Sequence, residues 1–238
     1  MYTIKEIAKM IDHSVLHPTY TDNDLKKQCL IANEHIVATV CVKPYHTKKA
    51  FQLLSDSEVL VCAVIGFPHG NSTIKIKAEE TLQVIKDGAA EVDMVVNAGK
   101  VLQGDWEYIE DEIREINSSC INNGAILKVI FETDFITNDK DKIKLCEICS
   151  KYKVAFVKTS TGYGFVKDST GKYGYKGATE YNVKLMRKHC SPEVRIKAAG
   201  GIRNLNELLI LKEAGADRIG ATATSQILEE AKIRYNDN

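Results

Sequence analysis

Four short apolar runs of this sequence each contain a charged residue of a kind that a buried strand does not normally hold. Asp93 lies in EVDMVVN, Lys128 in ILKVIFET, Lys158 in VAFVKTS and Lys197 in RIKAAG. Burying a charge costs several kcal/mol unless the group is paired or loses its charge. A single strand lysine is more often solvated at a strand end, but three lysines and an aspartate in such runs favour a shared functional pocket.

The chemistry that these residues could perform is nucleophilic catalysis by an amine. Adjacent parallel strands lie about 4.8 Å apart, so the ammonium groups of Lys158 and Lys197 could come within several ångströms of each other. Like charge and loss of water both favour the neutral amine, and a neutral amine can form a Schiff base with an aldehyde or ketone. Asp93 offers a carboxylate for proton transfer. The spacing alone does not say which lysine attacks.

These charged residues belong to a regular alternation of β-rich runs and helical stretches. Helices are predicted at 4–10, 73–87, 105–123 and 204–214, the last three each followed by a glycine that can end a helix. Strands are predicted at 12–16, 37–42, 59–67, 91–97, 126–133, 154–160, 195–200 and 218–223. Such an alternation is typical of βαβ units around a parallel sheet.

The predicted fold is a single-domain (β/α)8 barrel (TIM barrel, α/β class) over residues 1–238, with an extra N-terminal helix. A doubly wound open sheet is the alternative, but eight strand–helix units without a dinucleotide-binding fingerprint favour the barrel. A closed barrel has no sheet edge on which strand lysines could be solvated. Its active site forms at the carboxyl ends of the strands, so that is where we expect the charged residues to meet.

Composition excludes several classes of function. The chain has 32 basic and 32 acidic residues, which gives no general attraction to nucleic acid or to an anionic membrane. Seven cysteines, an odd number mostly in apolar runs, indicate reduced thiols in a cytoplasmic protein. No apolar run reaches the ~18–20 residues of a membrane span. A zinc site at Cys146 and Cys149 is not expected, because no second cysteine pair lies nearby.

The motifs around these residues match a known family in sequence order. They are IDHSVLHP at 11–18, VCVKP at 40–44, IGFPHG at 65–70, EVDMVVN at 91–97, LKVIFE at 127–132, FVKTSTG at 156–162, IKAAGGIR at 196–203 and DRIGAT at 217–222. Together they resemble deoxyribose-phosphate aldolase, a class I (Schiff-base) aldolase family, over nearly the whole chain. FVKTSTG followed by KAAGGIR is the most specific part of the resemblance.

The resemblance implies a reaction and a set of roles. The reaction is the reversible cleavage of 2-deoxy-D-ribose 5-phosphate into acetaldehyde and D-glyceraldehyde 3-phosphate, without a metal or another cofactor. Lys158 would be the Schiff-base lysine, Lys197 the second cation that keeps its amine uncharged, and Asp93 a proton-transfer group. Residues matched to the substrate pocket and its polar surroundings are Asp12, Ser14, Leu16, Cys41 and Lys128. Homodimerisation is a further expectation from the family.

The substrate phosphate needs an anchor of its own, since the net charge is zero. Barrels commonly bind phosphate after the seventh and eighth strands, through backbone N–H groups and a helix N-terminus. Residues expected to form this site are Gly162, Gly200, Gly201, Arg203, Gly220 and Thr222. Each glycine by itself would be explained equally well by an ordinary tight turn.

Several positions depart from the family pattern. Residues 165–175 are an insertion, expected to be a disordered surface loop, with a pocket cap or a subunit contact as alternatives. Thr222 and Ala223 stand where hydroxyl residues are usual, and Ser14 replaces a usual threonine. Tyr235 near the C-terminus is outside the predicted catalytic set, because no motif anchors it.

Two other functions stay open from the sequence. One is a Schiff-base aldolase for a different phosphorylated aldehyde, because the insertion could reshape the pocket. The other is a non-catalytic barrel that binds sugar phosphates. The second is disfavoured because a binding protein would gain nothing from burying an unpaired lysine pair.

Overall fold

The structure, a computed structural model that describes residues 2–236, contains a closed barrel of eight parallel strands. Neighbouring strands follow the order β1, β2, β3, β4, β5, β6, β9, β10 and back to β1. Their bounds are β1 Ile11–Val15, β2 Thr39–Val42, β3 Leu60–Ile65, β4 Glu91–Val95, β5 Ile126–Ile130, β6 Phe156–Lys158, β9 Arg195–Ala199 and β10 Arg218–Ala221. All eight predicted strands and the predicted (β/α)8 fold are confirmed.

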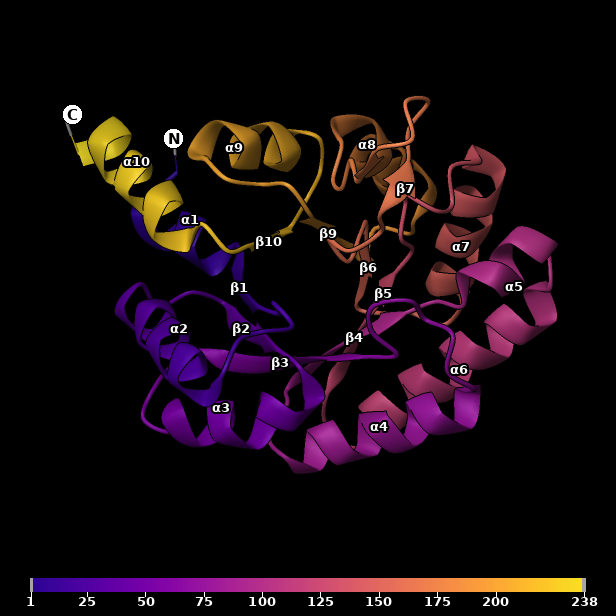
Figure 1. Cartoon of the computed structure of the whole chain (residues 1–238), viewed down its shortest axis with the longest axis horizontal. Coiled ribbons are helices and arrows are strands. Elements are labelled where there is room, and N and C mark those ends of the chain that lie inside the picture. The colour runs from indigo at the N-terminus through magenta and orange to yellow at the C-terminus, as the bar shows by residue number, and fades with distance from the viewer. Residues whose placement is uncertain (1, 237–238) are drawn as a thin grey trace.

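Helices surround these strands (Figure 1). They are α1 Ile4–Lys9, α2 Asp22–Glu34, the short 3-10 helix η1 Pro44–His46, α3 Thr47–Leu53, α4 Ile74–Lys86, α5 Ala98–Gln103, α6 Trp106–Asn122, α7 Asp139–Lys151, α8 Glu180–His189, α9 Leu205–Glu213 and α10 Thr224–Asn236. The extra N-terminal helix α1 packs against α10, so the first and last helices lie side by side. No helix among residues 2–236 has the length and apolar character needed to cross a bilayer.

Capping residues explain where the predicted helices begin. The side chains of Thr73, Asp105 and Asn204 accept hydrogen bonds from backbone N–H groups in the first turns of α4, α6 and α9. Gly88 and Gly124 follow two of these helices with φ of 103° and 74°, a region that glycine enters without a Cβ clash. These local signals fix the helix ends to within one or two residues of the prediction.

The register of the sheet brings the charged strand residues together. Asp93 is aligned with Lys128 on the neighbouring strand, and Lys158 is aligned with Lys197. All four side chains are buried. The expected proximity of the two lysines therefore follows directly from the pairing of β6 with β9.

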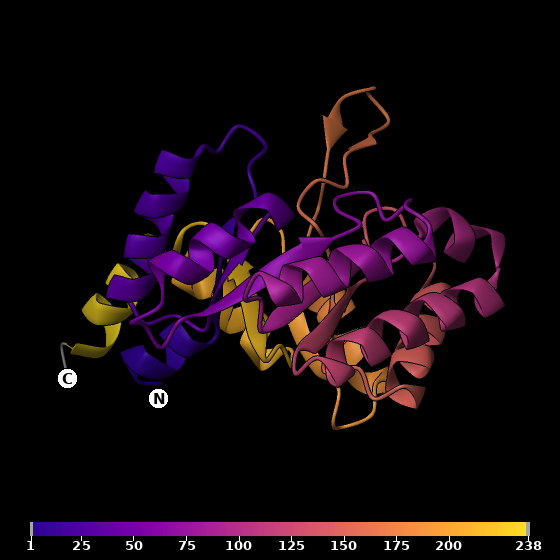
Figure 2. The same cartoon turned by 90° about the horizontal axis from the view of Figure 1, so that it is seen from below.

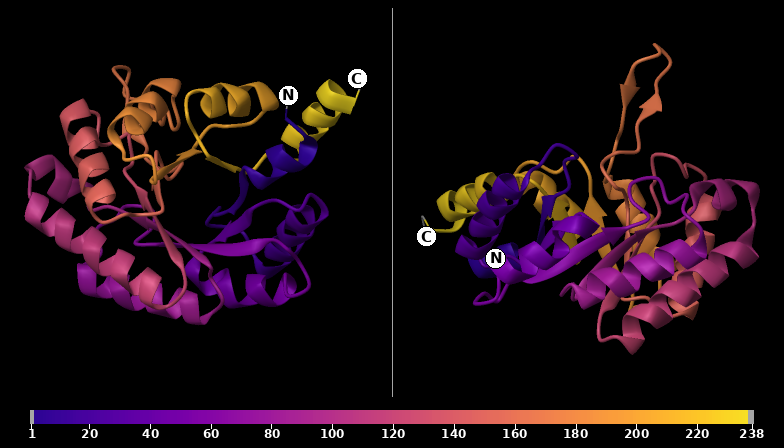
Figure 3. Two further views of the ribbon diagram at one scale, coloured as in Figure 1. Left: turned by 180° about the vertical axis from the view of Figure 1, so that it is seen from behind. Right: turned by 60° about the horizontal axis from the view of Figure 1, so that its bottom comes forward.

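The insertion at 165–175 differs from its prediction. It forms an antiparallel hairpin of β7 Val166–Lys167 and β8 Tyr173–Gly174, which stands away from the barrel (Figures 2 and 3). The expectation of a disordered loop is wrong, because local hydrogen bonds order the turn. The Asp168 carboxylate accepts hydrogen bonds from the backbone N–H groups of Thr170 and Lys172. At the base of the hairpin, Phe165 and Tyr175 pack edge to face with ring centroids 5.4 Å apart.

Candidate active site

A cavity of about 300 Å³ opens at the carboxyl ends of the strands, where a barrel of this kind keeps its active site. Lys158 reaches its wall from the end of β6, whereas Lys128 and Lys197 are not among its lining residues. The lining residues are Ser14, Leu16, His17, Tyr20, Lys158, Thr161, Gly162, Tyr163, Tyr175, Ala199, Gly200, Gly201, Ile202, Arg203, Gly220, Ala221 and Thr222. The structure thus distinguishes Lys158 from the other two strand lysines, which the spacing could not do.

Asp93 is the centre of the charged group below this cavity. Its Oδ1 lies 2.7 Å from Lys128 Nζ, and its Oδ2 lies 2.7 Å from Lys158 Nζ and 2.8 Å from Lys197 Nζ. Burial by itself would raise the pKa of Asp93, but the three lysines hold that pKa well below its usual range. Asp93 is therefore a carboxylate that three ammonium groups share.

Asp12 is a second buried carboxylate, and it contacts Lys197 from the other side. The distance from its Oδ2 to Lys197 Nζ is 2.5 Å, and Oδ1 lies 2.6 Å from Arg218. Burial disfavours the charged form of Lys197, but Asp12 and Asp93 outweigh this effect and raise the pKa of Lys197 above its usual range. Lys197 is therefore a cation beside Lys158 at neutral pH.

The sequence-based view of these lysines as an unpaired pair is wrong. Lys158 and Lys197 share one oxygen of Asp93, so each has a counterion. Asp93 on β4 lies two strands from β6 and three strands from β9, but it can reach both lysines because the side chains of all these strands converge inside the closed sheet. Because the buried lysines are paired, their burial by itself is not an argument against a non-catalytic sugar-phosphate-binding protein.

The ion-paired group inside the barrel contains more cations than carboxylates. Ion pairs of 3.6 Å or less join four cationic groups to three carboxylates, which leaves one excess positive charge. The groups are Lys128, Lys158, Lys197 and Arg218 with Asp12, Glu91 and Asp93. Among the described residues Lys158 pairs with one carboxylate, whereas each of the other cations pairs with two or more.

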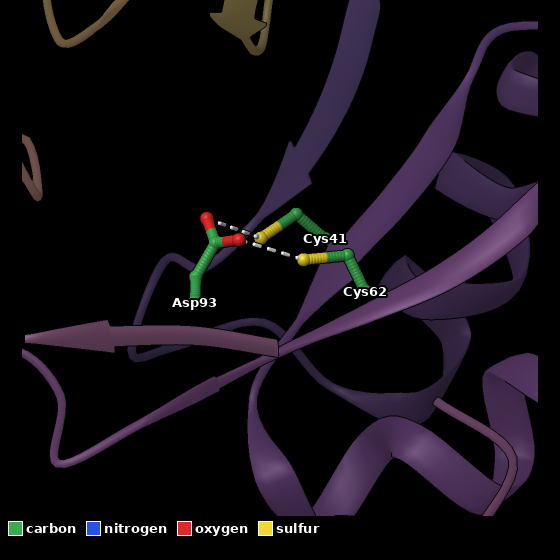
Figure 4. A group of neighbouring side chains, drawn as sticks. All are labelled: Cys41, Cys62 and Asp93. Carbon is green, nitrogen blue, oxygen red and sulfur yellow. Dashed lines mark hydrogen bonds between the residues drawn. The ribbon is translucent and has the colours of Figure 1, made fainter. Parts of the chain in front are cut away.

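Two thiols complete the surroundings of Asp93 (Figure 4). Cys62 Sγ lies 3.1 Å from Asp93 Oδ1 and Cys41 Sγ lies 3.9 Å from Oδ2. Two thiols and a carboxylate are possible metal ligands. Three ammonium groups on the same carboxylate oppose a further cation by Coulomb repulsion, so this cluster does not fit a metal site.

The structure places the predicted substrate-pocket residues in two layers. Ser14 and Leu16 line the cavity, as do all six residues expected around the phosphate. Asp12 and Cys41, expected to line the pocket, are fully buried and are not among the lining residues. Lys128, expected in the surrounding polar network, is buried as well and does not line the cavity. The reason is the alternation along a strand: residues two positions apart share the inner face but lie at different depths.

Some lining residues were absent from the sequence-based set. Thr161, Tyr163 and Ile202 lie within or directly beside the FVKTSTG and KAAGGIR motifs, so motif proximity could have found them. Tyr20 and Tyr175 come from a loop and from the base of the hairpin, and only the fold brings them to the cavity.

The glycines expected at the phosphate allow close approach of the backbone. Gly200 and Gly201 have φ of 94° and 84°, values that other residues rarely adopt. A Cβ on Gly220 would lie 2.9 Å from Ala199 Cβ. Helix α10 begins at Thr224, just after the lining residue Thr222, so its N-terminus lies close to this wall.

Comparison with known proteins agrees with this arrangement. The chain matches the family described as DeoC/LacD family aldolase over residues 6–226. It is 44% identical to the deoxyribose-phosphate aldolase of Rhodopirellula baltica, a match covering 97% of this chain and 91% of the relative. It is 42% identical to the enzyme of the same name from Caldanaerobacter subterraneus subsp. tengcongensis, covering 97% and 95%.

Solved structures give the same result. The fold is similar to that of QR15, an aldolase, with a TM-score of 0.87 and 33% identity over 97% of this chain and 98% of the other. It is also similar to the deoxyribose phosphate aldolase of Aeropyrum pernix, described as tetrameric, with a TM-score of 0.85 and 27% identity over 98% and 93%.

Proposed function

This chain belongs to the DeoC/LacD family of aldolases, and from that premise we propose that it cleaves 2-deoxy-D-ribose 5-phosphate reversibly through a Schiff base on Lys158. The products are acetaldehyde and D-glyceraldehyde 3-phosphate, which makes the protein a carbon–carbon lyase of deoxyribose phosphate catabolism. The observation that carries the assignment of the lysine is its position: Lys158 is the member of the buried ionic group that lines the cavity.

The ion pairing and the position of the lysines support Lys158 as the nucleophile. The amine must lose a proton before it can attack the substrate aldehyde. Lys197 lies between Asp12 and Asp93, whereas Lys158 has one carboxylate partner among the described residues and lines the cavity that would hold the substrate. The free amine adds to C1 of the substrate and, after loss of water, forms an iminium.

Bond cleavage follows from the chemistry of the iminium. It withdraws the electrons of the C2–C3 bond as the C3 hydroxyl loses its proton and C3 becomes the aldehyde of glyceraldehyde 3-phosphate. The remaining enamine takes a proton at C2, and hydrolysis releases acetaldehyde and the free lysine. We assign the proton transfers to Asp93 and Lys197, with water as a relay. In this reaction the iminium performs the polarisation that a metal performs in other aldolases.

The glycine-rich part of the cavity lining is the proposed phosphate site. Gly162, Gly200, Gly201, Gly220 and Thr222 would offer backbone or hydroxyl donors, while the N-terminus of α10 and Arg203 supply positive potential. With the phosphate bound there, the aldehyde end of the substrate would lie at Lys158.

A second candidate is a Schiff-base aldolase for another phosphorylated aldehyde. Tyr175, at the end of the insertion, lines the cavity and would contact the part of the substrate farthest from the aldehyde. The ratio of kcat/KM for 2-deoxy-D-ribose 5-phosphate to that for longer 2-deoxy sugar phosphates separates the two candidates.

Borohydride trapping tests the proposed nucleophile. We expect incubation with acetaldehyde and borohydride to give a reduced adduct on Lys158, located by peptide mass spectrometry and lost in Lys158→Ala. Lys188→Ala, a change at an exposed lysine of α8, is the matched control and should keep the adduct. An adduct on Lys128 would assign the nucleophile elsewhere, and no adduct with any aldehyde would favour a binding protein.

The compartment and the assembly are also proposals. The seven cysteines are all free and buried, which supports a reducing compartment such as the cytoplasm. The homodimer expected from the family stays a prediction.

A further inference from the structure

Glu132 adopts a backbone conformation that needs an explanation. It follows β5 with φ of 57°, in the left-handed region that residues other than glycine rarely enter, and its side chain is buried. Such a conformation persists only where the surroundings enforce it. Glu132 has no place in the mechanism proposed above.

The Glu132 carboxylate contacts the wall of the cavity from behind. Its Oε2 accepts hydrogen bonds from the backbone N of Thr161, at 3.1 Å, and from the Thr161 hydroxyl. Thr161 Oγ1 in turn accepts a hydrogen bond from Tyr163 N at 2.9 Å. Gly164 packs so closely that a Cβ there would lie 2.7 Å from Glu132 Cδ. One carboxylate therefore fixes the turn that contains Gly162.

Asp134, two residues later, holds the far end of the same segment. Its Oδ1 and Oδ2 accept hydrogen bonds from Lys176 N at 2.6 Å and from Gly177 N at 3.0 Å. Gly177 packs directly on Gly200, because a Cβ on Gly177 would lie 2.4 Å from the Gly200 carbonyl oxygen. Ala178 N also donates to that carbonyl at 3.0 Å. The contact thus continues from Asp134 to the proposed phosphate site.

We propose that Glu132 and Asp134 are positioning residues that hold the two ends of segment 161–177 and thereby set the position of Gly162 and Gly200 around the substrate phosphate. This inference rests on the proposed function. The segment includes a hairpin that stands in solvent, so contacts at its base must keep the backbone N–H groups in place. Small displacements of such groups weaken binding strongly.

The test measures KM and kcat separately for a phosphorylated and an unphosphorylated substrate. In Glu132→Ala and Asp134→Ala we expect KM for 2-deoxy-D-ribose 5-phosphate to rise about tenfold while kcat changes little. The kinetics with 2-deoxy-D-ribose, which lacks the phosphate, should stay the same. Glu132→Gln keeps an oxygen acceptor for Thr161 and should restore most of the affinity.

Hydrogen exchange reports the displacement itself. Faster amide exchange is expected at Thr161 and Tyr163 in Glu132→Ala, and at Lys176 and Gly177 in Asp134→Ala. The matched control is Asp168→Ala, which removes hydrogen bonds inside the hairpin turn and should leave KM for both substrates unchanged.

Equal rises in KM for the two substrates, or a loss confined to kcat, would overturn the inference, as would unchanged kinetics in both alanine variants. If Glu132→Ala does not fold, Thr161→Val removes the hydroxyl donor and Asp134→Ala tests the other end of the segment.

Borohydride trapping separates the two proposals. Wild type without an adduct contradicts the Schiff base. Adducts in every variant with unchanged KM contradict only the positioning role.

Discussion

At the scale of single residues, the nucleophilic role that we propose for Lys158 depends on the charges that surround Asp93. Three lysines contact this carboxylate, and Lys197 is bound a second time by Asp12. Lys158 has one carboxylate partner among the described residues, and it lines the cavity. Its neighbours and its access to the cavity, rather than an unusual residue type, thus distinguish Lys158 from the other two lysines.

Replacing Lys197 should alter the pH dependence of the reaction. Lys197→Leu removes the ammonium group that contacts Asp93 beside Lys158 and that we assign to proton transfer. We expect kcat/KM near neutral pH to fall about 100-fold and the pH profile of the activity to change, as measured by initial rates across pH 6–10. Lys188→Leu should leave the profile unchanged, and an unchanged profile in Lys197→Leu would reject this role.

At the scale of elements, a buried ion pair connects helices α4 and α6 to each other and to the end of β4. Lys77 of α4 and Glu112 of α6 lie 2.6 Å apart with neither side chain exposed. Lys77 Nζ also donates to Val95 O at 2.7 Å, and Asn97 N donates to Glu112 at 3.1 Å. This pair fixes the turn after β4, the strand that carries Asp93.

Breaking this pair should destabilise the barrel. Lys77→Met leaves Glu112 buried without its counterion, and we expect the free energy of unfolding to fall by roughly 3–5 kcal/mol. The exposed pair of Lys184 and Glu180, also 2.6 Å apart, is the control; Lys184→Met should change stability by less than about 1 kcal/mol. Urea unfolding measures both, and equal effects would show that burial of the pair is unimportant.

At the scale of the whole molecule, the ionic group crosses the barrel and ties distant parts of the chain together. Arg218 of the last strand contacts Asp12 of the first, at 2.6 Å, and also Glu91 of β4. The Arg218–Asp12 ion pair joins the first and last strands through their side chains. The β1–β10 pairing joins the same two strands by backbone hydrogen bonds. We propose that residues 1–238 accordingly form one domain.

The buried ionic group should make the free energy of unfolding depend on pH in the acid range. Burial opposes ionisation of Asp12 and Asp93, but the nearby cations lower both pKa values below the usual range. In acid the unfolded chain therefore binds more protons than the folded chain does. The stabilisation from these two carboxylates is complete above their unfolded pKa of about 4 and is lost as the pH falls below that value.

Asp12→Asn tests this dependence. It should lower stability at pH 7 and flatten the loss of stability between pH 4 and pH 2, as followed by urea unfolding at each pH. Asp56→Asn, at an exposed carboxylate, is the control and should keep the wild-type slope. The same slope in Asp12→Asn would contradict the assignment.

The sequence by itself determined the local features of this protein. Alternating apolar patterns gave all eight barrel strands, capping residues gave the helix ends, and charged residues in apolar runs located Asp93, Lys158 and Lys197. These features depend on neighbours in the chain, so a window of a few residues contains the signal. Motif resemblance added the family.

The tertiary structure alone decided which side chains meet and at what depth. Closure of the barrel makes Lys158 line the cavity, gives Lys197 two carboxylates and buries Cys62 against Asp93. The left-handed backbone of Glu132 and the order of the hairpin likewise depend on contacts across the fold. Such pairings join residues up to 211 positions apart, as in the hydrogen bond between His13 and Thr224, and no local pattern records them, because their energy exists only after the sheet has closed.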